Sequence, residues 1–282
     1  MAGYTHLEDE FGDVVGKARR GQERRVEEVA EGAGIAAGDL ERIEAYEWIP
    51  DGEVVEGLAG TLSLHPGKLR VSAEAAYFPA HPWGGPGEGL DVRMLILGDD
   101  FLMNGYVVTC RRTGEAAIVD PGFQGDRLLE AAAESGARVG QVWLTHGHAD
   151  HVGDLSLVLG ATGAGAAIGA EDLALTGGLA ARIEGRLEPG CRIALGEQSF
   201  TVAHTPGHTP GGVSLVHEQA AFVGDALFAG SLGGTRRRVD YDGQRRAVRR
   251  ELLSLPPETI LYPGHGPATT VEEERRNNPF FD

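Results

Sequence analysis

The apolar residues of the chain follow two different spacings, and the change comes near residue 80. Between residues 10 and 75 they recur at the spacing of one helix face, as at Val26, Val29 and Ala30. This stretch is therefore predicted to form four or five short helices.

Beyond residue 90, short strand-like segments alternate with helical patterns. The predicted strands are residues 92–97, 106–109, 116–119, 141–144, 166–168, 199–202, 213–216, 220–223 and 259–261. The predicted helices are residues 126–135, 153–159 and 245–253, followed by a terminal helix that Thr270 and Glu273 open as a capping box. Such alternation predicts sheets covered by helices, in the α/β (α+β) class.

The two patterns are separated by a stretch rich in proline and glycine, residues 79–89. Stretches of this composition are typical of linkers and ordered loops. We therefore expect a helical domain at residues 1–80, a linker at 81–90 and a second domain at 91–282.

Composition and charge narrow the class of protein. The chain has 282 residues and a net charge of −17 at pH 7, which repels nucleic acid and anionic membranes over most of the surface. No apolar stretch approaches the ~20 residues that a membrane-spanning helix needs, and the polar first residues do not look like a signal peptide. Because Cys110 and Cys191 are too few for a disulfide framework, we expect a cytoplasmic protein without membrane contact.

Part of the helical region resembles the helix-turn-helix of Cro and related repressors. Ala30, Gly34, Leu40 and Ile43 occupy the positions where that motif has its small residue, its turn glycine and two buried aliphatic residues. The resemblance covers roughly a quarter of the chain and implies an all-helical domain that could bind DNA.

The charge of this region argues against DNA binding. The helix that would read DNA carries Asp39, Glu41 and Glu44 against Arg42, and residues 1–80 contain 8 Lys/Arg and 16 Asp/Glu. A DNA-binding face needs cations to meet phosphates. We therefore expect no nucleic-acid partner, and a helical region that covers the site of the second domain or mediates formation of a homo-oligomer.

The densest group of chemically active residues follows the predicted strand 141–144. His146, His148, Asp150 and His151 place three imidazoles and a carboxylate within six residues. So many ionisable groups need a compensating charge. Imidazole nitrogen and carboxylate oxygen are ligands of zinc, iron or manganese, so the segment predicts a metal site.

Three later residues extend this set. His208 lies in a turn-rich stretch between two predicted strands, Asp225 follows strand 220–223, and His265 follows strand 259–261. Each has glycine beside it, which allows a close approach of the backbone. Strand ends on one edge of a sheet point into a common crevice, so the sequence predicts that these residues share the metal site.

The complete pattern resembles the metallo-β-lactamase-fold hydrolases, over nearly all of residues 91–282. The resemblance implies an αββα sandwich with the site at one edge of its two sheets. It also implies two divalent metal ions, most often Zn²⁺, with Fe or Mn as alternatives. By the family's pattern, His146, His148 and His208 hold the first ion, Asp150, His151 and His265 hold the second, and Asp225 bridges them.

The same resemblance implies a hydrolytic mechanism. A hydroxide that bridges the metal ions attacks a carbonyl carbon while a metal ion polarises the carbonyl oxygen. Asp150 is the candidate catalytic residue, because it can also orient the hydroxide.

Four further residues are candidates for supporting roles. Asp120, in a Val-Asp-Pro-Gly turn, is expected to support the histidine loop from behind, and His204 to hydrogen-bond a ligand or the backbone, with a plain strand-end histidine as the alternative. Arg236 and Arg237 belong to the main basic segment of an acidic chain. We hypothesise that they bind a carboxylate or phosphate of an anionic small-molecule substrate, although a solvated surface is an equally good interpretation.

Within the superfamily, residues 204–211, 224–230 and 262–270 are similar to the short bacterial members of the glyoxalase II group. That similarity implies hydrolysis of an acyl-thioester such as S-lactoylglutathione. Residues 231–238 lack the Lys/Tyr pair of the glutathione-binding enzymes, and the chain extends only to Asp282 after His265. The alternatives are a persulfide dioxygenase with one iron, a lactonase or other ester hydrolase, and a DNA-binding regulator that senses metabolites through its metal domain.

Overall fold

The computed structural model describes residues 4–85 and 87–282. Its N-terminal part contains five helices, as predicted: α1 (Phe11–Gly21), α2 (Val26–Ala33), α3 (Ala37–Glu44), α4 (Gly52–Leu62) and α5 (Pro66–Ala73). Local sequence explains several of their ends. Asp51 caps α4 by accepting hydrogen bonds from two backbone N–H groups, and α2 ends at Gly34, whose φ of 73° is readily adopted by glycine.

The first sheet has six strands in the order β1-β2-β3-β4-β5-β6. The strands are β1 (Leu90–Leu97), β2 (Met103–Cys110), β3 (Glu115–Val119), β4 (Arg138–Leu144), β5 (Gly165–Ile168) and β6 (Gly185–Arg186). β1, β2 and β3 pair antiparallel, whereas β3 to β6 pair parallel. The parallel pairing places the ends of β4 and β5 at the same edge of the sheet.

The second sheet has six strands in the order β12-β11-β10-β9-β8-β7. The strands are β7 (Arg192–Leu195), β8 (Gln198–His204), β9 (Val213–Val216), β10 (Ala220–Gly224), β11 (Ile260–Pro263) and β12 (Thr269–Thr270). β10 and β11 are parallel, so the residues that follow these two strands emerge side by side.

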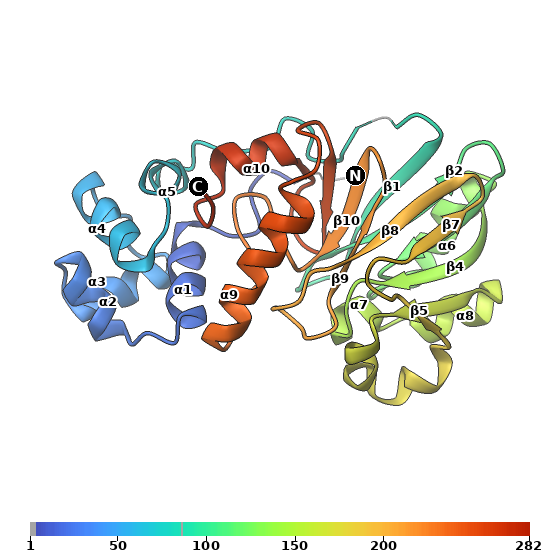
Figure 1. Ribbon diagram of the computed structural model, residues 1–282, viewed down its shortest axis with the longest axis horizontal. Coiled ribbons are helices and arrows are strands. Elements are labelled where there is room, and N and C mark those ends of the chain that lie inside the picture. The colour runs from blue at the N-terminus through green and yellow to red at the C-terminus, as the bar shows by residue number, and fades with distance from the viewer. Residues whose placement is uncertain (1–3, 86) are drawn as a thin grey trace.

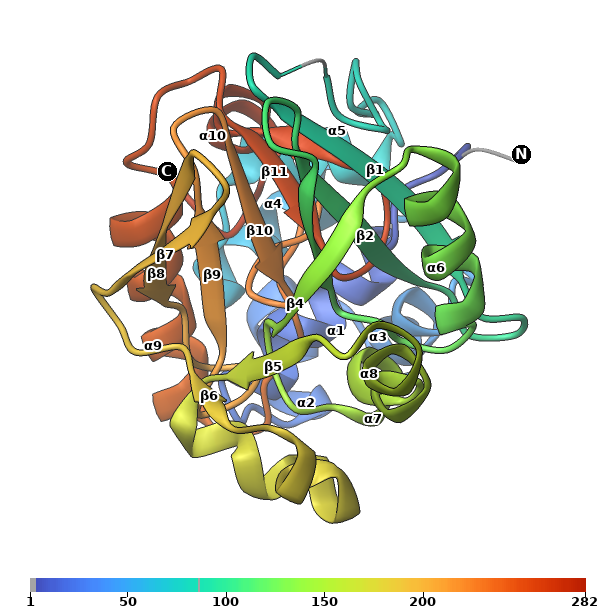
Figure 2. The same ribbon diagram turned by 90° about the vertical axis from the view of Figure 1, so that its right-hand side faces the viewer.

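Helices cover the outer faces of both sheets (Figures 1 and 2). They are α6 (Gly125–Glu134), α7 (Ala149–Val152), α8 (Leu155–Thr162), α9 (Arg238–Ala247) and α10 (Val271–Asn277), with a 3₁₀ segment η1 (Ala170–Arg182) and a π-helical turn η2 (Val248–Leu252). Alternate residues of β4 show the layering, because Trp143 packs between the sheets while Val142 and Leu144 pack beneath α6 and α8. The predicted αββα sandwich is confirmed.

The N-terminal helices pack onto the outer face of the second sheet and its helices. One continuous apolar cluster joins Leu40 and Leu58 of the helical region to Leu252, Phe280 and Phe281 near the C-terminus, all of them buried. Figure 1 shows α1 beside α9 and α5 near α10. The helical region and the sandwich therefore share a hydrophobic core.

Some predicted boundaries were wrong. The helix predicted at 245–253 begins at Arg238. Its first turns were missed because they are mostly polar, although Tyr241, Gln244 and Ala247 form a buried face. The short strands β6, β7 and β12 and the segment η1 were not predicted. In the predicted linker 81–90, Pro86 lies outside the described residues, as do residues 1–3 of the predicted helical domain.

Across residues 4–85 and 87–282, we find no helix with the length and apolar character needed to cross a lipid bilayer.

Candidate metal centre

The segment after β4 carries four of the seven predicted ligands. His146 lies in the loop that leaves the strand, His148 directly precedes α7, and Asp150 and His151 belong to α7 itself. The loop turns tightly because Gly147 packs against residue 172: a Cβ at position 147 would lie 2.7 Å from the Asp172 carbonyl oxygen. This close packing directs the side chains toward the gap between the two sheets.

The second sheet supplies the other three. His208 lies in the loop between β8 and β9, Asp225 follows β10, and His265 follows the neighbouring parallel strand β11. Gly264 is needed beside them, because a Cβ at that position would lie 2.1 Å from Asp225 Oδ1. All seven predicted side chains therefore lie at one edge of the sandwich.

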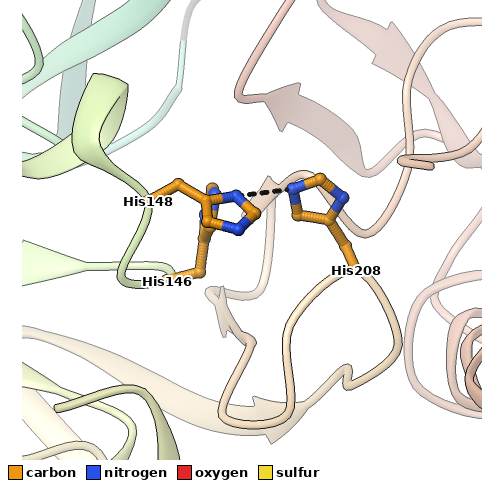
Figure 3. Close-up of side chains that lie close together, drawn as sticks. All are labelled: His146, His148 and His208. Carbon is orange, nitrogen blue, oxygen red and sulfur yellow. Dashed lines mark hydrogen bonds between the residues drawn. The ribbon is translucent and has the colours of Figure 1, made fainter. Parts of the chain in front are cut away.

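The first group of potential ligands consists of three imidazoles. One side-chain nitrogen from each of His146, His148 and His208 lies within 4.8 Å of the other two. His208 Nε2 lies 2.9 Å from His148 Nδ1, and Figure 3 shows the ring of His208 approaching those of His146 and His148 from the opposite loop. His208 Nδ1 donates to the Gly234 carbonyl at 2.9 Å, which leaves its Nε2 facing the group.

The second group consists of Asp150, His151 and His265, again with ligand atoms within 4.8 Å of one another. His151 Nδ1 donates to Asp120 Oδ2 at 2.9 Å, and His265 Nδ1 donates to the Leu102 carbonyl at 2.7 Å. The Nε2 atoms of the two rings therefore face each other at 3.4 Å. Two neutral rings in these tautomers would oppose lone pairs, so a proton or a metal cation must lie between them.

Asp225 lies between the two groups. Its Oδ2 is 3.2 Å from His208 Nε2 and 3.6 Å from His265 Nε2, while its Oδ1 is 3.4 Å from His151 Nε2. One carboxylate thus reaches both groups of ligands.

Two buried atoms test whether these residues fit a metal. Among the described residues, His146 Nε2 and Asp225 Oδ1 have no hydrogen-bond partner although both are inaccessible to solvent. Buried polar atoms are rarely left unpaired unless an ion or water satisfies them. The nitrogen and oxygen donors suit a divalent transition metal, so the residues fit such an ion.

The histidine pKa values shift in opposite directions in the two groups of ligands. Burial and the neighbouring imidazoles lower the pKa of His146, and burial followed by the charge of His208 lowers the pKa of His148. Burial also opposes the charge on His265, but the carboxylates of Asp225 and Asp150 outweigh it and raise the His265 pKa to about 9. Burial would raise the pKa of Asp150, yet the hydrogen bond with His265 and the charge of His151 lower it to about 2.

Asp120 lies directly behind the histidine loop. Besides its bond to His151, it accepts from the backbone N–H of Thr145 at 2.8 Å and from the Thr145 hydroxyl at 2.6 Å. Both carboxylate oxygens are thereby used to hold the loop. His204 makes a different contact, because its Nε2 lies 3.1 Å from the carbonyl of Pro210 and it touches the backbone of the His208 loop.

The two arginines singled out in the sequence are placed differently. Arg237 forms two hydrogen bonds with Asp240, at 2.7 and 2.8 Å. Arg236 forms no hydrogen bond or ion pair within the described part of the chain, and it lines a hollow beside residues 19–24. Arg236 is therefore the more available of the two for an anion.

Two buried residues near the site were not singled out in the sequence. Asp172 accepts from the N–H groups of Gly147 at 3.0 Å and Gly211 at 2.6 Å, and so ties together the two loops of the first group. The Gln244 amide donates to the carbonyls of Ala226 and Gly233 and holds the loop that follows Asp225. Neither residue has a sequence signal, since Asp172 lies in an irregular 3₁₀ segment and Gln244 in a polar helix.

Comparison with known proteins identifies the family. The sequence profile of the Metallo-beta-lactamase superfamily matches residues 98–265, which is more than half of the chain and includes all seven candidate ligands. The chain belongs to the metallo-beta-lactamase superfamily.

Individual members of the superfamily are also similar. The hydroxyacylglutathione hydrolase GloC of Haemophilus influenzae is 34% identical over 187 residues, which cover 59% of this chain and 87% of that protein. Among solved structures, TTHA1623 in a di-iron-bound form is 34% identical with a TM-score of 0.57, covering 67% of this chain and 99% of that one. ETHE1 from Myxococcus xanthus is 28% identical with a TM-score of 0.57, covering 67% of this chain and 83% of its own.

Proposed function

We propose that this member of the metallo-beta-lactamase superfamily hydrolyses an acyl-thioester, as glyoxalase II enzymes do, with two divalent metal ions. The observation that carries the proposal is the meeting of five imidazoles and two carboxylates around the unpaired atoms His146 Nε2 and Asp225 Oδ1. The similarity to a hydroxyacylglutathione hydrolase supports the thioester as substrate.

The candidate ligands would hold the metals in two positions. His146, His148 and His208 form the first position, Asp150, His151 and His265 the second, and Asp225 lies between them. When bound, divalent cations activate water and polarise a substrate carbonyl.

The chain's own residues supply orientation and protons. Asp150, whose low pKa keeps it ionised, accepts a hydrogen bond from the attacking water and orients it toward the carbonyl carbon. Asp120 keeps His151 in one tautomer, and the Gly234 carbonyl does the same for His208. The leaving thiolate needs no side-chain acid, because it is a stable anion near neutral pH.

Metal analysis and a substrate panel test this proposal together. We expect about two equivalents of zinc per chain in the purified protein, with iron or manganese as the alternatives, and turnover of S-lactoylglutathione that a chelator abolishes. One equivalent of iron with oxygen consumption on a persulfide would instead indicate a dioxygenase. Turnover of lactones or simple esters without thioesters would contradict the thioester assignment.

The role of the N-terminal helical region is a separate question. α2 and α3 meet at Gly34 as in a helix-turn-helix, but Glu44 of α3 is paired with Arg19 of α1, and Asp39 and Glu41 leave the helix acidic. We infer that this region packs on the sandwich and takes part in the substrate site or in a homo-oligomer, without a nucleic-acid partner. A gel-shift assay at low salt tests this, and a retarded complex with duplex DNA would contradict it.

A further inference from the structure

A basic hollow lies between the helical region and the loop that follows Asp225. Its volume is about 560 Å³. From the helical region it is lined by Arg19, Arg20, Glu23 and Arg24, and from the loop by Gly234, Thr235 and Arg236. We call this set of residues the arginine hollow; it combines two parts of the chain that are more than 200 positions apart.

The arginine hollow adjoins the metal centre. The carbonyl of Gly234, which lines it, accepts the hydrogen bond from His208 Nδ1 at 2.9 Å. The preceding residue is equally close, because a Cβ on Gly233 would lie 3.2 Å from the same nitrogen. A group bound in the hollow would therefore lie beside the first group of metal ligands.

Tight packing fixes the position of the helical arginines. At the end of α1, a Cβ on Gly21 would lie 2.5 Å from the ring of Tyr241 and 2.8 Å from Thr235 Oγ1. Glu23 accepts a hydrogen bond from the backbone N–H of Arg238 at 2.9 Å. These contacts lock the turn between α1 and α2 against the loop, so the two sets of arginines face the same space.

The charge in the arginine hollow is only partly compensated. Arg19 is committed to Glu44 through two hydrogen bonds of 2.6 and 2.7 Å. Arg20 makes a single 3.3 Å contact with that carboxylate, and its side chain is 52% exposed.

The remaining two guanidinium groups keep their full charge. Arg24 donates to the carbonyls of Thr61 and Glu28, which bind the group without neutralising it. Arg236 is unpaired among the described residues. Glu23, which also lines the hollow, offsets one of these charges. The net positive charge that remains attracts anions toward the metal centre of a chain with a net charge of −17.

We propose that the arginine hollow binds the anionic group, a carboxylate or a phosphate, of the thiol carrier of the substrate, with Arg236 and Arg20 as its principal ligands. The planar fork of arginine matches both anions through paired hydrogen bonds. This inference rests on the proposed thioesterase function and adds to it that the helical region completes the substrate site.

The first experiment compares thioesters that share one acyl group and differ in the charge of the carrier. The variants are Arg236→Ala and Arg20→Ala, with Arg112→Ala as the matched control, since Arg112 follows the end of β2 remote from the metal centre and pairs with Glu197. The substrates are the lactoyl thioesters of three thiols: glutathione, which carries carboxylates; coenzyme A, which carries phosphates; and N-acetylcysteamine, which is neutral.

For at least one charged substrate, each test variant is expected to raise KM about tenfold with little change in kcat, because a charge-assisted hydrogen bond to the anion is lost. The neutral substrate and the control variant should be unaffected. The charged substrate that responds identifies the anion as carboxylate or phosphate. Equal losses on charged and neutral substrates, or a KM unchanged for both charged ones, would overturn the proposal.

A second measurement does not depend on turnover. Binding of inorganic phosphate in the millimolar range is followed by ³¹P NMR on the metal-loaded protein, and Arg236→Ala and Arg20→Ala should each weaken it about tenfold. Phosphate bound only to the metals would not respond to these substitutions. If no thioester is cleaved but phosphate binding depends on the arginines, the anion site stands and the thioesterase proposal fails. Phosphate binding that is absent or identical in all variants would refute the site itself.

Discussion

The two groups of ligands at the metal centre differ in how they are stabilised without a cation. The first group, His146, His148 and His208, contains imidazoles alone, and burial disfavours protonation of His146 and His148. The second group includes Asp150, and the carboxylates around His265 hold a proton on it with a pKa of about 9. In the first group His146 and His148 thus remain neutral, and His148 and His208 share a hydrogen bond of 2.9 Å, whereas the second group holds an additional proton where a metal would lie.

Two buried aspartates support the two groups in different ways. Asp120 bonds directly to His151 of the second group and to Thr145. Asp172 does not contact a ligand ring and instead binds the backbone of the two loops that carry the first group. Asp120 thus acts directly on a ring of the second group and also reaches the first through Thr145, whose hydroxyl lies 3.1 Å from His146 Nδ1, whereas Asp172 acts through the backbone of the loops.

The largest effect is expected from Asp225→Ala. This substitution removes the carboxylate that reaches both groups, so the difference between them should no longer be seen. Loss of one member of a buried charge cluster costs about 3–5 kcal/mol, or roughly 150- to 5,000-fold in a binding constant. Metal affinity should fall at both positions and thioester hydrolysis with it. Mass spectrometric metal analysis and chelator competition measure this; loss of metal from one position alone would show that Asp225 is not shared.

The second largest effect is expected from pH, which should change the metal affinity of one position but not of the other. Below pH about 9, His265 carries a proton that a cation must displace, so affinity at the second position should fall with decreasing pH, approaching tenfold per unit and reaching about 50-fold between pH 9 and 7. His146 and His148, with lowered pKa values, release no proton in this range. Competition with a chromophoric chelator across this range is the measurement. Two positions that weaken in parallel would contradict the difference.

Asp120→Ala should weaken the second position by about 10- to 100-fold, the usual effect of removing a carboxylate behind a ligand histidine. The reason is that His151 loses the partner that fixes its tautomer. The exposed Asp126, replaced by alanine, is the control. Metal titration of both variants would decide the matter, and an equal loss at both positions would indicate general disruption of the loop.

Asp172→Ala should have the smallest effect, a loss of about tenfold in affinity at the first position. It leaves the N–H groups of Gly147 and Gly211 without their acceptor, and each unpaired buried group costs about 1–3 kcal/mol. Its exposed neighbour Glu171 provides the matched alanine control. The same titration applies, and a selective loss at the second position would run against the assignment of Asp172 to the first group.

The sequence predicted the sandwich and the residues that meet at its edge, because strand-end positions and neighbouring glycines both have local signals. His208, Asp225 and His265 each follow or join strands whose apolar pattern is plain. The sequence did not identify Asp172 as a supporting residue, because a 3₁₀ segment has no 3.6-residue period. Gln244 did so because its helix is mostly polar, and a buried amide is not marked by the residues around it.

The contacts between the two halves of the chain could not be predicted either. Apolar faces in residues 10–75 indicate that helices bury something, but not that they pack on Leu252 and Phe281. The arginine hollow has the same origin, since Arg20 and Arg236 come together only through that packing.

The shared hydrophobic core means that the sandwich of this protein cannot be obtained by shortening the chain. A fragment beginning at residue 81 would leave Leu252, Phe280 and Phe281 facing water, and each such side chain contributes about 1.5–3 kcal/mol when buried. We expect that fragment to aggregate rather than to fold on its own, so that the first eighty residues act as part of the scaffold of the sandwich.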